Sequence, residues 1–190
     1  VGAPPPPSLK QLDSFGGVIQ LGTFSKNLFP GLRTGWVHAA PPVINRLAQE
    51  KQFVDLHSNN LAQMIVHAAL EENSLPLHLA MVRREYRKRR NAMAAAIKKY
   101  CGAAMWFELP EGGLYIWGRL SPTVLPTELL RRAAPLGISF IPGDAFYAHG
   151  ADSHEIRLCF ATHDEDRLTE GIRRLAKALN VATPEESLPA

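Results

Sequence analysis

The sequence predicts a mixed α/β fold in two parts, and three observations support this prediction. Short apolar runs rich in β-branched residues alternate with longer runs of helical periodicity along the 190 residues. Beyond Gly102 the pattern changes from long helical runs to short strands, which predicts that a second, smaller domain begins there. Hydrophobic residues make up 46% of the chain, enough for a globular core at this length.

The first part is predicted to hold two strands and two helices. The strands span residues 18–21 and 34–39, and the helices run from Pro41 onward and over 55–72. A stiff proline connector at 4–7 precedes these elements. The first strand ends at Gly22, immediately before the polar residues 23–26. We therefore expect this strand to deliver them to its carboxyl end, where α/β sheets place ligands.

A long amphipathic helix is predicted over residues 77–100, where apolar residues recur at spacings of 3, 4, 7 and 4. Its other face is strongly basic over residues 83–90. A solvated charged face is the usual role of such a run, and contact with a nucleic acid is the alternative.

The smaller domain is predicted to alternate strands with helices. The strands span 105–109, 114–120, 138–141 and 155–161, and the helices span 127–136 and 162–179. Thr162 and Glu165 predict a capping box at the start of the last helix. The helical spacing of this last segment predicts four buried residues, namely Leu168, Ile172, Leu175 and Leu179.

Composition argues against several classes of protein. The net charge of +3 is mildly basic, but acidic residues are interspersed, so the whole chain carries no nucleic-acid signature. Cys101 and Cys159 lie far apart in apolar surroundings, which predicts reduced thiols in a cytoplasmic protein rather than a disulfide. The histidines lack metal-ligand spacing, and no apolar run approaches the roughly 18–20 residues that span a bilayer. We therefore expect no metal site and no membrane span.

The segment 22–36 gathers the groups of a phosphate site around a lysine. Thr23 and Ser25 bring hydroxyls that donate to phosphate oxygens, and Arg33 brings a guanidinium that can pair with a dianion through two hydrogen bonds. The Lys26 amine is then left for covalent chemistry with an aldehyde, which requires its unprotonated form. The alternative is that Lys26 is a solvated surface lysine and Arg33 a partner in a surface ion pair.

This segment resembles the lysine segment of the fold-type I pyridoxal-phosphate-dependent aminotransferases of class I/II, which has the pattern Ser/Thr-x-Ser-Lys-x(6)-Arg. The resemblance implies the C-terminal part of the PLP-dependent transferase fold, that is, part of the large-domain sheet plus the small α/β domain. It also implies pyridoxal 5'-phosphate (PLP) as cofactor, bound as an aldimine to a catalytic Lys26 that later shuttles the substrate proton. By the same resemblance, Thr23, Ser25 and Arg33 hold the phosphate.

A second match to the same family lies late in the chain. Arg157 is a single arginine in the otherwise apolar strand 155–161, and a buried arginine needs a partner. The resemblance implies that Arg157 binds the α-carboxylate of an amino-acid substrate with two parallel hydrogen bonds. The alternative is an edge-strand arginine that faces water. Segments 110–117 and 141–147 also resemble small-domain signatures, and we interpret them as turn and packing features.

The resemblance implies a division of the chain into four regions. They are the C-terminal part of the large PLP-binding domain at 1–78, a long linking helix at 79–100, the small domain at 101–180 and a tail at 181–190. Only the later half of the family's fold is covered. We therefore interpret the chain as a fragment and expect the residues that contact the pyridine ring to lie outside it. The family also implies a homodimer, because its active site is built at a subunit interface.

Two functions are compatible with this resemblance. In the first, the protein is an aminotransferase that transfers an amino group between an amino acid and a 2-oxo acid. In the second, the chain is the domain of a MocR-type regulator of the GntR family that senses PLP or an amino compound, and DNA is bound only by a domain outside this chain. Segments 7–13, 24–33 and 51–57 resemble the regulators more than central-metabolic transaminases. A helix-turn-helix preceding this chain would decide for the regulator.

Overall fold

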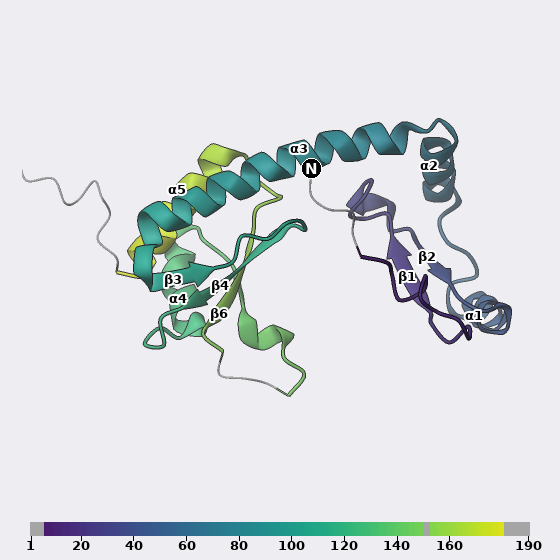
Figure 1. Ribbon diagram of the computed structural model, residues 1–190, viewed down its shortest axis with the longest axis horizontal. Helices are drawn as coiled ribbons and strands as arrows, with labels where there is room; N and C mark the ends of the chain where they lie inside the picture. The colour runs from purple at the N-terminus through teal and green to yellow at the C-terminus, as the bar shows by residue number, and fades with distance from the viewer. Residues whose placement is uncertain (1–5, 150–152, 181–190) are drawn as a thin grey trace, which may run out of the picture. The chain divides into compact units, whose positions relative to one another are not determined.

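The structure is a computed structural model that describes residues 6–149 and 153–180 (Figure 1). It has the mixed α/β architecture that the sequence predicts. The chain divides into two compact units between Val82 and Arg83, within the long helix α3 (Ser74–Ala96). The domain limits at 78 and 100 stay predictions. The predicted tail 181–190 and the start of the proline run 4–7 lie outside the described residues.

The first unit contains a two-stranded antiparallel sheet and three helical segments longer than one turn among its described residues. The strands are β1 (Gln20–Thr23) and β2 (Gly35–His38), the loop between them contains the 3-10 helix η1 (Pro30–Leu32), and the helices are α1 (Pro41–Val54), α2 (Asn60–Glu71) and the start of α3. Thr23 pairs with Gly35. This pair closes the loop at residues 23–35, here called the lysine loop because it contains Lys26, so strand pairing holds its two ends side by side.

The chain enters β1 through a turn organised by Asp13. The Asp13 carboxylate accepts hydrogen bonds from the backbone N–H groups of residues 15–18 and pairs with the Lys10 amine at 2.9 Å. The bond from Lys10, followed by those from the backbone, holds the pKa of this carboxyl well below its usual range. Because Asp13 engages the N–H of residue 18, β1 begins at Gln20, two residues later than the sequence predicts.

Few side chains of the first unit are buried. Among its described residues only Ala62 and Val66 of α2 are buried. Large apolar side chains are exposed on both strands and on α1 and α2, including Leu21, Phe53 and Met64. The lysine loop is therefore positioned by strand pairing and local turns rather than by a surrounding core.

The second unit is built on a four-stranded antiparallel sheet with the order β3-β4-β6-β5 in the described residues. Its strands are β3 (Met105–Phe107), β4 (Tyr115–Leu120), β5 (Ile141–Pro142) and β6 (Glu155–Cys159). Its helices are the rest of α3, η2 (Ile97–Cys101), η3 (Gly102–Ala104), α4 (Pro126–Ala133), η4 (Ala134–Leu136), η5 (Gly143–Phe146) and α5 (Glu165–Ala178). Alternate residues of β4 and β6 point to opposite faces, so Ile116 and Ile156 are buried while Trp117 and Arg157 lie on the open face.

The core lies between one face of this sheet and helices α3, α4 and α5 (Figure 1). The apolar face predicted for the last helix is confirmed, since all four of its predicted residues are buried, namely Leu168, Ile172, Leu175 and Leu179. Cys101 lies in the same core, and burial raises the pKa of its thiol to about 12. Cys101 and Cys159 are both free, so the described chain has no disulfide between them.

The helix predicted at 55–72 starts later than expected. Asp55 ends α1, and Leu56 adopts a left-handed backbone with φ 58°. Asn59 then caps α2, because its side chain accepts a hydrogen bond from the backbone N–H of Ala62 at 3.1 Å. The prediction is therefore wrong for residues 55–59, which connect the two helices.

The capping box predicted for the last helix is also wrong. Asp164, not Thr162, is the N-cap of α5, and its carboxylate accepts a hydrogen bond from the backbone N–H of Arg167 at 2.9 Å. Either residue type caps helices well, so composition alone does not choose between them.

Two other predicted elements change at their ends. The helix predicted at 77–100 is present, but its last turn, Ile97–Cys101, widens into a π-helix. The strand predicted at 138–141 is present only at Ile141–Pro142, because the backbone N–H of Ile138 bonds back to the Ala133 carbonyl at the end of α4.

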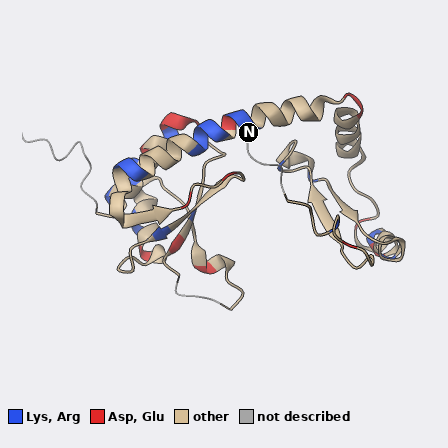
Figure 2. Cartoon of the chain, viewed as in Figure 1, with Lys and Arg blue, Asp and Glu red and all other residues tan. Residues whose placement is uncertain are grey.

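The basic stretch 83–90 lies along α3 (Figure 2). Arg89 donates to the carbonyl of Ala161 at 2.6 Å and Arg90 to that of Pro110 at 2.8 Å, so two of its cations bind backbone inside the second unit. Two further cations pair with the glutamate of the same stretch. These contacts favour a partly paired, solvated helix face over a nucleic-acid surface. Within residues 6–149 and 153–180, each helix is too short or too polar to traverse a lipid bilayer.

Candidate active site

The predicted phosphate-binding residues lie together on the loop that joins β1 to β2. Thr23 is the last residue of β1, Arg33 follows η1, and Ser25 lies between them. The Arg33 guanidinium donates to Ser25 Oγ at 3.4 Å and to the Pro30 carbonyl at 3.3 Å. The Thr23 hydroxyl accepts from the Ser25 N–H at 3.1 Å and donates to the Thr34 carbonyl at 3.5 Å. Two hydroxyls and a guanidinium are thus linked on one loop.

The backbone of this loop bends sharply at Arg33. Its φ of 51° and ψ of 33° are left-handed, a conformation that residues other than glycine rarely adopt. Two residues later, the backbone leaves no room for a side chain at Gly35, because a Cβ there would lie 2.8 Å from the Gly22 carbonyl oxygen. Left-handed backbone at a non-glycine residue is a form of local strain that clusters at functional sites.

Lys26 lies in the turn that follows β1, and its side chain is exposed. Among residues 6–149 and 153–180, no hydrogen bond or ion pair engages its amine. Phe29 of the same loop contacts the ring of His78 in α3, with ring centroids 5.9 Å apart. These residues fit PLP, because the loop offers hydroxyl and guanidinium donors for a phosphate dianion and an uncommitted amine for an aldehyde.

Arg157 lies on β6, an interior strand of the second unit's sheet. It is paired with Trp117 of β4 on one side and with Ile141 of β5 on the other, so the edge-strand alternative is wrong. Its half-buried guanidinium lies 4.1 Å from the ring centroid of Tyr115 and 4.7 Å from that of Phe146. The arginine is therefore framed by aromatic rings on the open face of the sheet.

The sequence pattern does not indicate that these rings lie beside Arg157. Tyr115 and Phe146 belong to the segments 110–117 and 141–147, which the sequence pattern identifies only as turns and packing features. Strand alternation places Tyr115 on one face of its own strand, but the pairing of β4 with β6 has no signal in the sequence. Because the rings come from separate segments, only the fold brings them to Arg157.

The sequence pattern also gives no indication that the carboxylate of Glu155, two residues before Arg157, is buried. Glu155 accepts hydrogen bonds from the Tyr147 hydroxyl and from Arg119, the latter at 3.1 Å. The bond from Tyr147, and then that from Arg119, lowers the pKa of the Glu155 carboxyl below its ordinary value of 4.5, and raises the pKa of Tyr147 in turn. Glu155 is thus ionised and already engaged by two other side chains.

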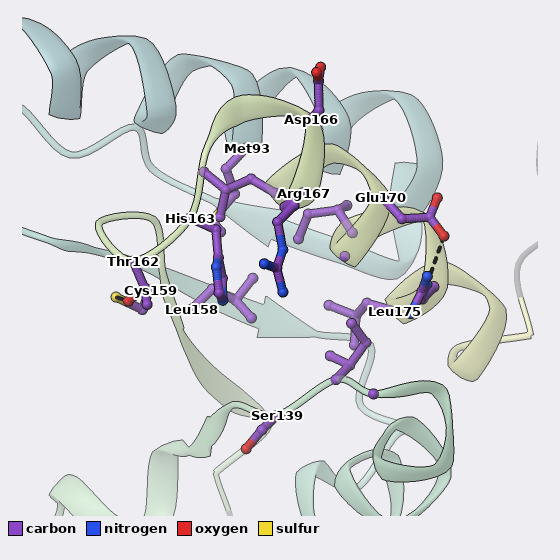
Figure 3. A pocket seen from close by; sticks show the side chains of 16 residues that line it. Met93, Ser139, Leu158, Cys159, Thr162, His163, Asp166, Arg167, Glu170 and Leu175 are labelled. Atoms are coloured by element: carbon purple, nitrogen blue, oxygen red, sulfur yellow. Dashed lines mark hydrogen bonds and ion pairs between the residues drawn. The ribbon is translucent and has the colours of Figure 1, made fainter.

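A separate cavity of about 660 Å³ lies in the described part of the second unit. It is bounded by α5, the end of β6 and residues 137–139, and Figure 3 shows Arg167 and His163 pointing into it while Asp166 points away. None of the predicted site residues lines this cavity. The predicted cofactor-binding residues are therefore those of the lysine loop in the first unit, and the predicted carboxylate-binding residue is Arg157 in the second unit.

Comparison with known proteins identifies the family. The family model for aminotransferase class I and II matches residues 4–175. The chain belongs to this aminotransferase family. The match includes the lysine loop and Arg157, so every predicted site residue lies within the family's range.

Relatives of this aminotransferase-family chain include both enzymes and regulators. It is 39% identical over 176 residues to the 2-aminoadipate transaminase of Thermus thermophilus, covering 91% of this chain and 44% of the relative. It is 34% identical over 178 residues to the uncharacterized HTH-type transcriptional regulator YisV of Bacillus subtilis, covering 91% of this chain and 35% of the relative.

Solved structures confirm the fold of this family in the chain. The crystal structure of LysN, an alpha-aminoadipate aminotransferase from Thermus thermophilus complexed with N-(5'-phosphopyridoxyl)-L-leucine, matches with a TM-score of 0.85 at 38% identity. That match covers 90% of this chain and 44% of LysN. The chain thus spans less than half the length of each of these relatives.

Proposed function

We propose that this chain is a PLP-binding aminotransferase-type domain that transfers an amino group between an amino acid and a 2-oxo acid. The observation that carries the proposal is the loop from Thr23 to Arg33, which links two hydroxyls and a guanidinium beside the uncommitted Lys26 amine. Membership of the aminotransferase family and the phosphopyridoxyl adduct bound by LysN support the same cofactor.

The proposed roles follow from the chemistry of each side chain. When bound, PLP supplies an aldehyde to which amines attach and a ring that spreads the charge developing at the substrate Cα. Arg33, with the hydroxyls of Thr23 and Ser25, binds the phosphate through charge-assisted hydrogen bonds. Lys26 would hold the cofactor covalently and, once the substrate amine has displaced it, its free amine would move the proton at the substrate Cα. Arg157 binds the substrate's α-carboxylate.

Family membership also supports the wider setting of this proposal. We propose that the full-length protein is a cytoplasmic homodimer and that side chains outside this chain contact the pyridine ring. The division into a large-domain part at 1–78, a linking helix at 79–100 and a small domain at 101–180 belongs to the same proposal.

A second candidate function is a sensor of PLP or of an amino compound in a MocR-type regulator. The observation that favours it is the likeness to YisV, an HTH-type transcriptional regulator, over 91% of this chain. The cofactor chemistry of Lys26 is common to both candidates, and turnover separates them. DNA would be bound by a domain outside this chain.

Absorption spectra of the full-length protein with PLP test the proposal, in the wild type and in Lys26→Ala. The exposed Lys51, which pairs with Asp55 at the end of α1, provides the control variant Lys51→Ala. We expect a band near the visible edge in the wild type and in the control, absent from Lys26→Ala, that shifts when L-2-aminoadipate is added. Turnover with a 2-oxo acid then supports the enzyme, and a shift without turnover supports the regulator. If no lysine-dependent band forms, the cofactor assignment is wrong.

A further inference from the structure

The Arg157 guanidinium lies close to two aromatic rings. Its central carbon lies 4.1 Å from the Tyr115 centroid and 4.7 Å from the Phe146 centroid, both within the roughly 6 Å range of cation–π attraction. The Phe146 ring is in turn in edge-to-face contact with Trp117, with centroids 5.4 Å apart. The rings come from β4 and η5, so two separate segments fix one side chain.

These contacts leave the hydrogen-bond donors of Arg157 uncommitted. Among residues 6–149 and 153–180, no carboxylate pairs with its guanidinium. The other charged side chain on this face of β6 that could do so is Glu155, and it is already engaged by Arg119 and by the Tyr147 hydroxyl. A half-buried arginine is therefore held without the ion pair that such a side chain usually has.

The geometry of a guanidinium explains what this arrangement achieves. Its N–H groups lie in the plane of the group and point outward from its edges, whereas aromatic rings attract its faces. An ion pair with a protein carboxylate would orient the side chain but would occupy the same edge that a ligand needs. Contact with the rings restrains the guanidinium without using its N–H groups as hydrogen-bond donors, so these groups stay available to a planar, bidentate acceptor.

We propose that Tyr115 and Phe146 are positioning residues that clamp Arg157 for bidentate binding of a ligand carboxylate, with Trp117 supporting Phe146. The inference rests on the proposed function, in which Arg157 binds the α-carboxylate. In this proposal the two rings hold the arginine in position, and ligands with a carboxylate depend on that position. The clamp favours α-amino acids over amines that lack a carboxylate, because only the former use the oriented edge.

The test is a spectral titration of the PLP-loaded, full-length protein with L-2-aminoadipate. Tyr115→Leu and Phe146→Leu should each raise the half-saturating concentration about 2- to 30-fold, the range that cation–π contacts of about 0.5–2 kcal/mol imply. Tyr115→Phe retains the ring and should stay near the wild type. Trp106→Leu removes an exposed aromatic from β3, outside the clamp, and should leave the titration unchanged.

A second readout does not depend on the loaded protein. In NMR spectra of the cofactor-free protein, the side-chain resonances of Arg157 should be shifted upfield by the two rings, and Tyr115→Leu should reduce this shift. A variant that merely loosens the domain would lower the melting temperature without this selective change. Phe146 is partly exposed, so Phe146→Leu remains informative if Tyr115→Leu fails to fold.

Arg157→Gln separates the clamp from the function on which it rests. If Arg157→Gln leaves the half-saturating concentration unchanged, Arg157 does not bind the ligand carboxylate, and both the proposed role of Arg157 and the clamp are wrong. If Arg157→Gln raises it but both leucine variants match the wild type, the carboxylate role stands and the clamp is overturned. The clamp is supported if all three variants raise the half-saturating concentration for L-2-aminoadipate but not that for a simple amine without a carboxylate.

Discussion

Replacing Arg33 tests two separate properties of this residue, namely phosphate binding by its side chain and strain in its backbone. In the proposed function the guanidinium donates charge-assisted hydrogen bonds to the phosphate, yet its residue is held in the left-handed region with φ 51°. Arg33→Ala and Arg33→Gly both remove the guanidinium, and only glycine adopts this backbone freely. The pair of variants therefore separates the role of the side chain from that of the backbone.

The structure sets the size of both effects. Left-handed backbone costs a non-glycine residue about 1–2 kcal/mol, and the extra freedom of an unfolded glycine offsets about 0.5–1 kcal/mol of the relief. Arg33→Gly should therefore be more stable than Arg33→Ala by up to about 1.5 kcal/mol, the reverse of the usual order. Loss of charged hydrogen bonds worth about 1.5–3 kcal/mol should raise the Kd for PLP about 10- to 150-fold in both variants.

Two measurements on the full-length protein check this prediction. Calorimetry of the cofactor-free form compares the melting temperatures, and Arg33→Gly should melt above Arg33→Ala. Titration with PLP compares the Kd values, which should rise together in the two variants. A higher melting temperature for Arg33→Ala would refute the strain argument, and an unchanged Kd would refute the assignment of Arg33 to the phosphate.

Two further predictions concern the loop and the sheet. Gly35→Ala places a Cβ 2.8 Å from the backbone oxygen of Gly22 and should lower the free energy of unfolding in urea by about 1–3 kcal/mol. The control Gly31→Ala has open space around its Cβ and should unfold at the same urea concentration as the wild type. Glu155 has a lowered pKa in the fold, so the stability it adds is present above its ordinary pKa of 4.5 and is lost as pH falls. Between about pH 7 and about pH 3, a range that includes the ordinary pKa values of carboxyl groups, the melting temperature should fall less steeply in Glu155→Gln than in the wild type. Equal slopes, or an equally shallow slope in the exposed control Glu128→Gln, would contradict the assignment to Glu155.

The lysine loop could be predicted from sequence because its groups lie close together in the chain. Thr23, Ser25, Lys26 and Arg33 occupy one short segment, so no tertiary contact is needed to gather them. The left-handed backbone at Arg33 could not be predicted, since arginine carries no preference for it. The start of β1 was also missed, because the hydrogen bonds of Asp13 to the following backbone compete with the strand.

The surroundings of Arg157 depend on tertiary structure that the sequence does not encode locally. Periodicity correctly predicts the strands β4 and β6, but their pairing, which brings Tyr115 beside the arginine, is set by the whole sheet. Phe146 belongs to η5, where no periodic pattern indicates which way its ring points. By contrast, all four residues predicted to be buried in the last helix are buried, because a helical repeat alone places them on one face, although the prediction missed the buried Ala176 and Ala178.

Chemical trapping tests the central assignment most directly. The full-length protein is incubated with PLP, reduced with sodium borohydride, digested and examined by mass spectrometry for the phosphopyridoxyl group. The proposed function predicts that this mass is found on Lys26 and is lost from the protein in Lys26→Ala. Stable modification of a different lysine, or none at saturating PLP, would contradict the role of Lys26.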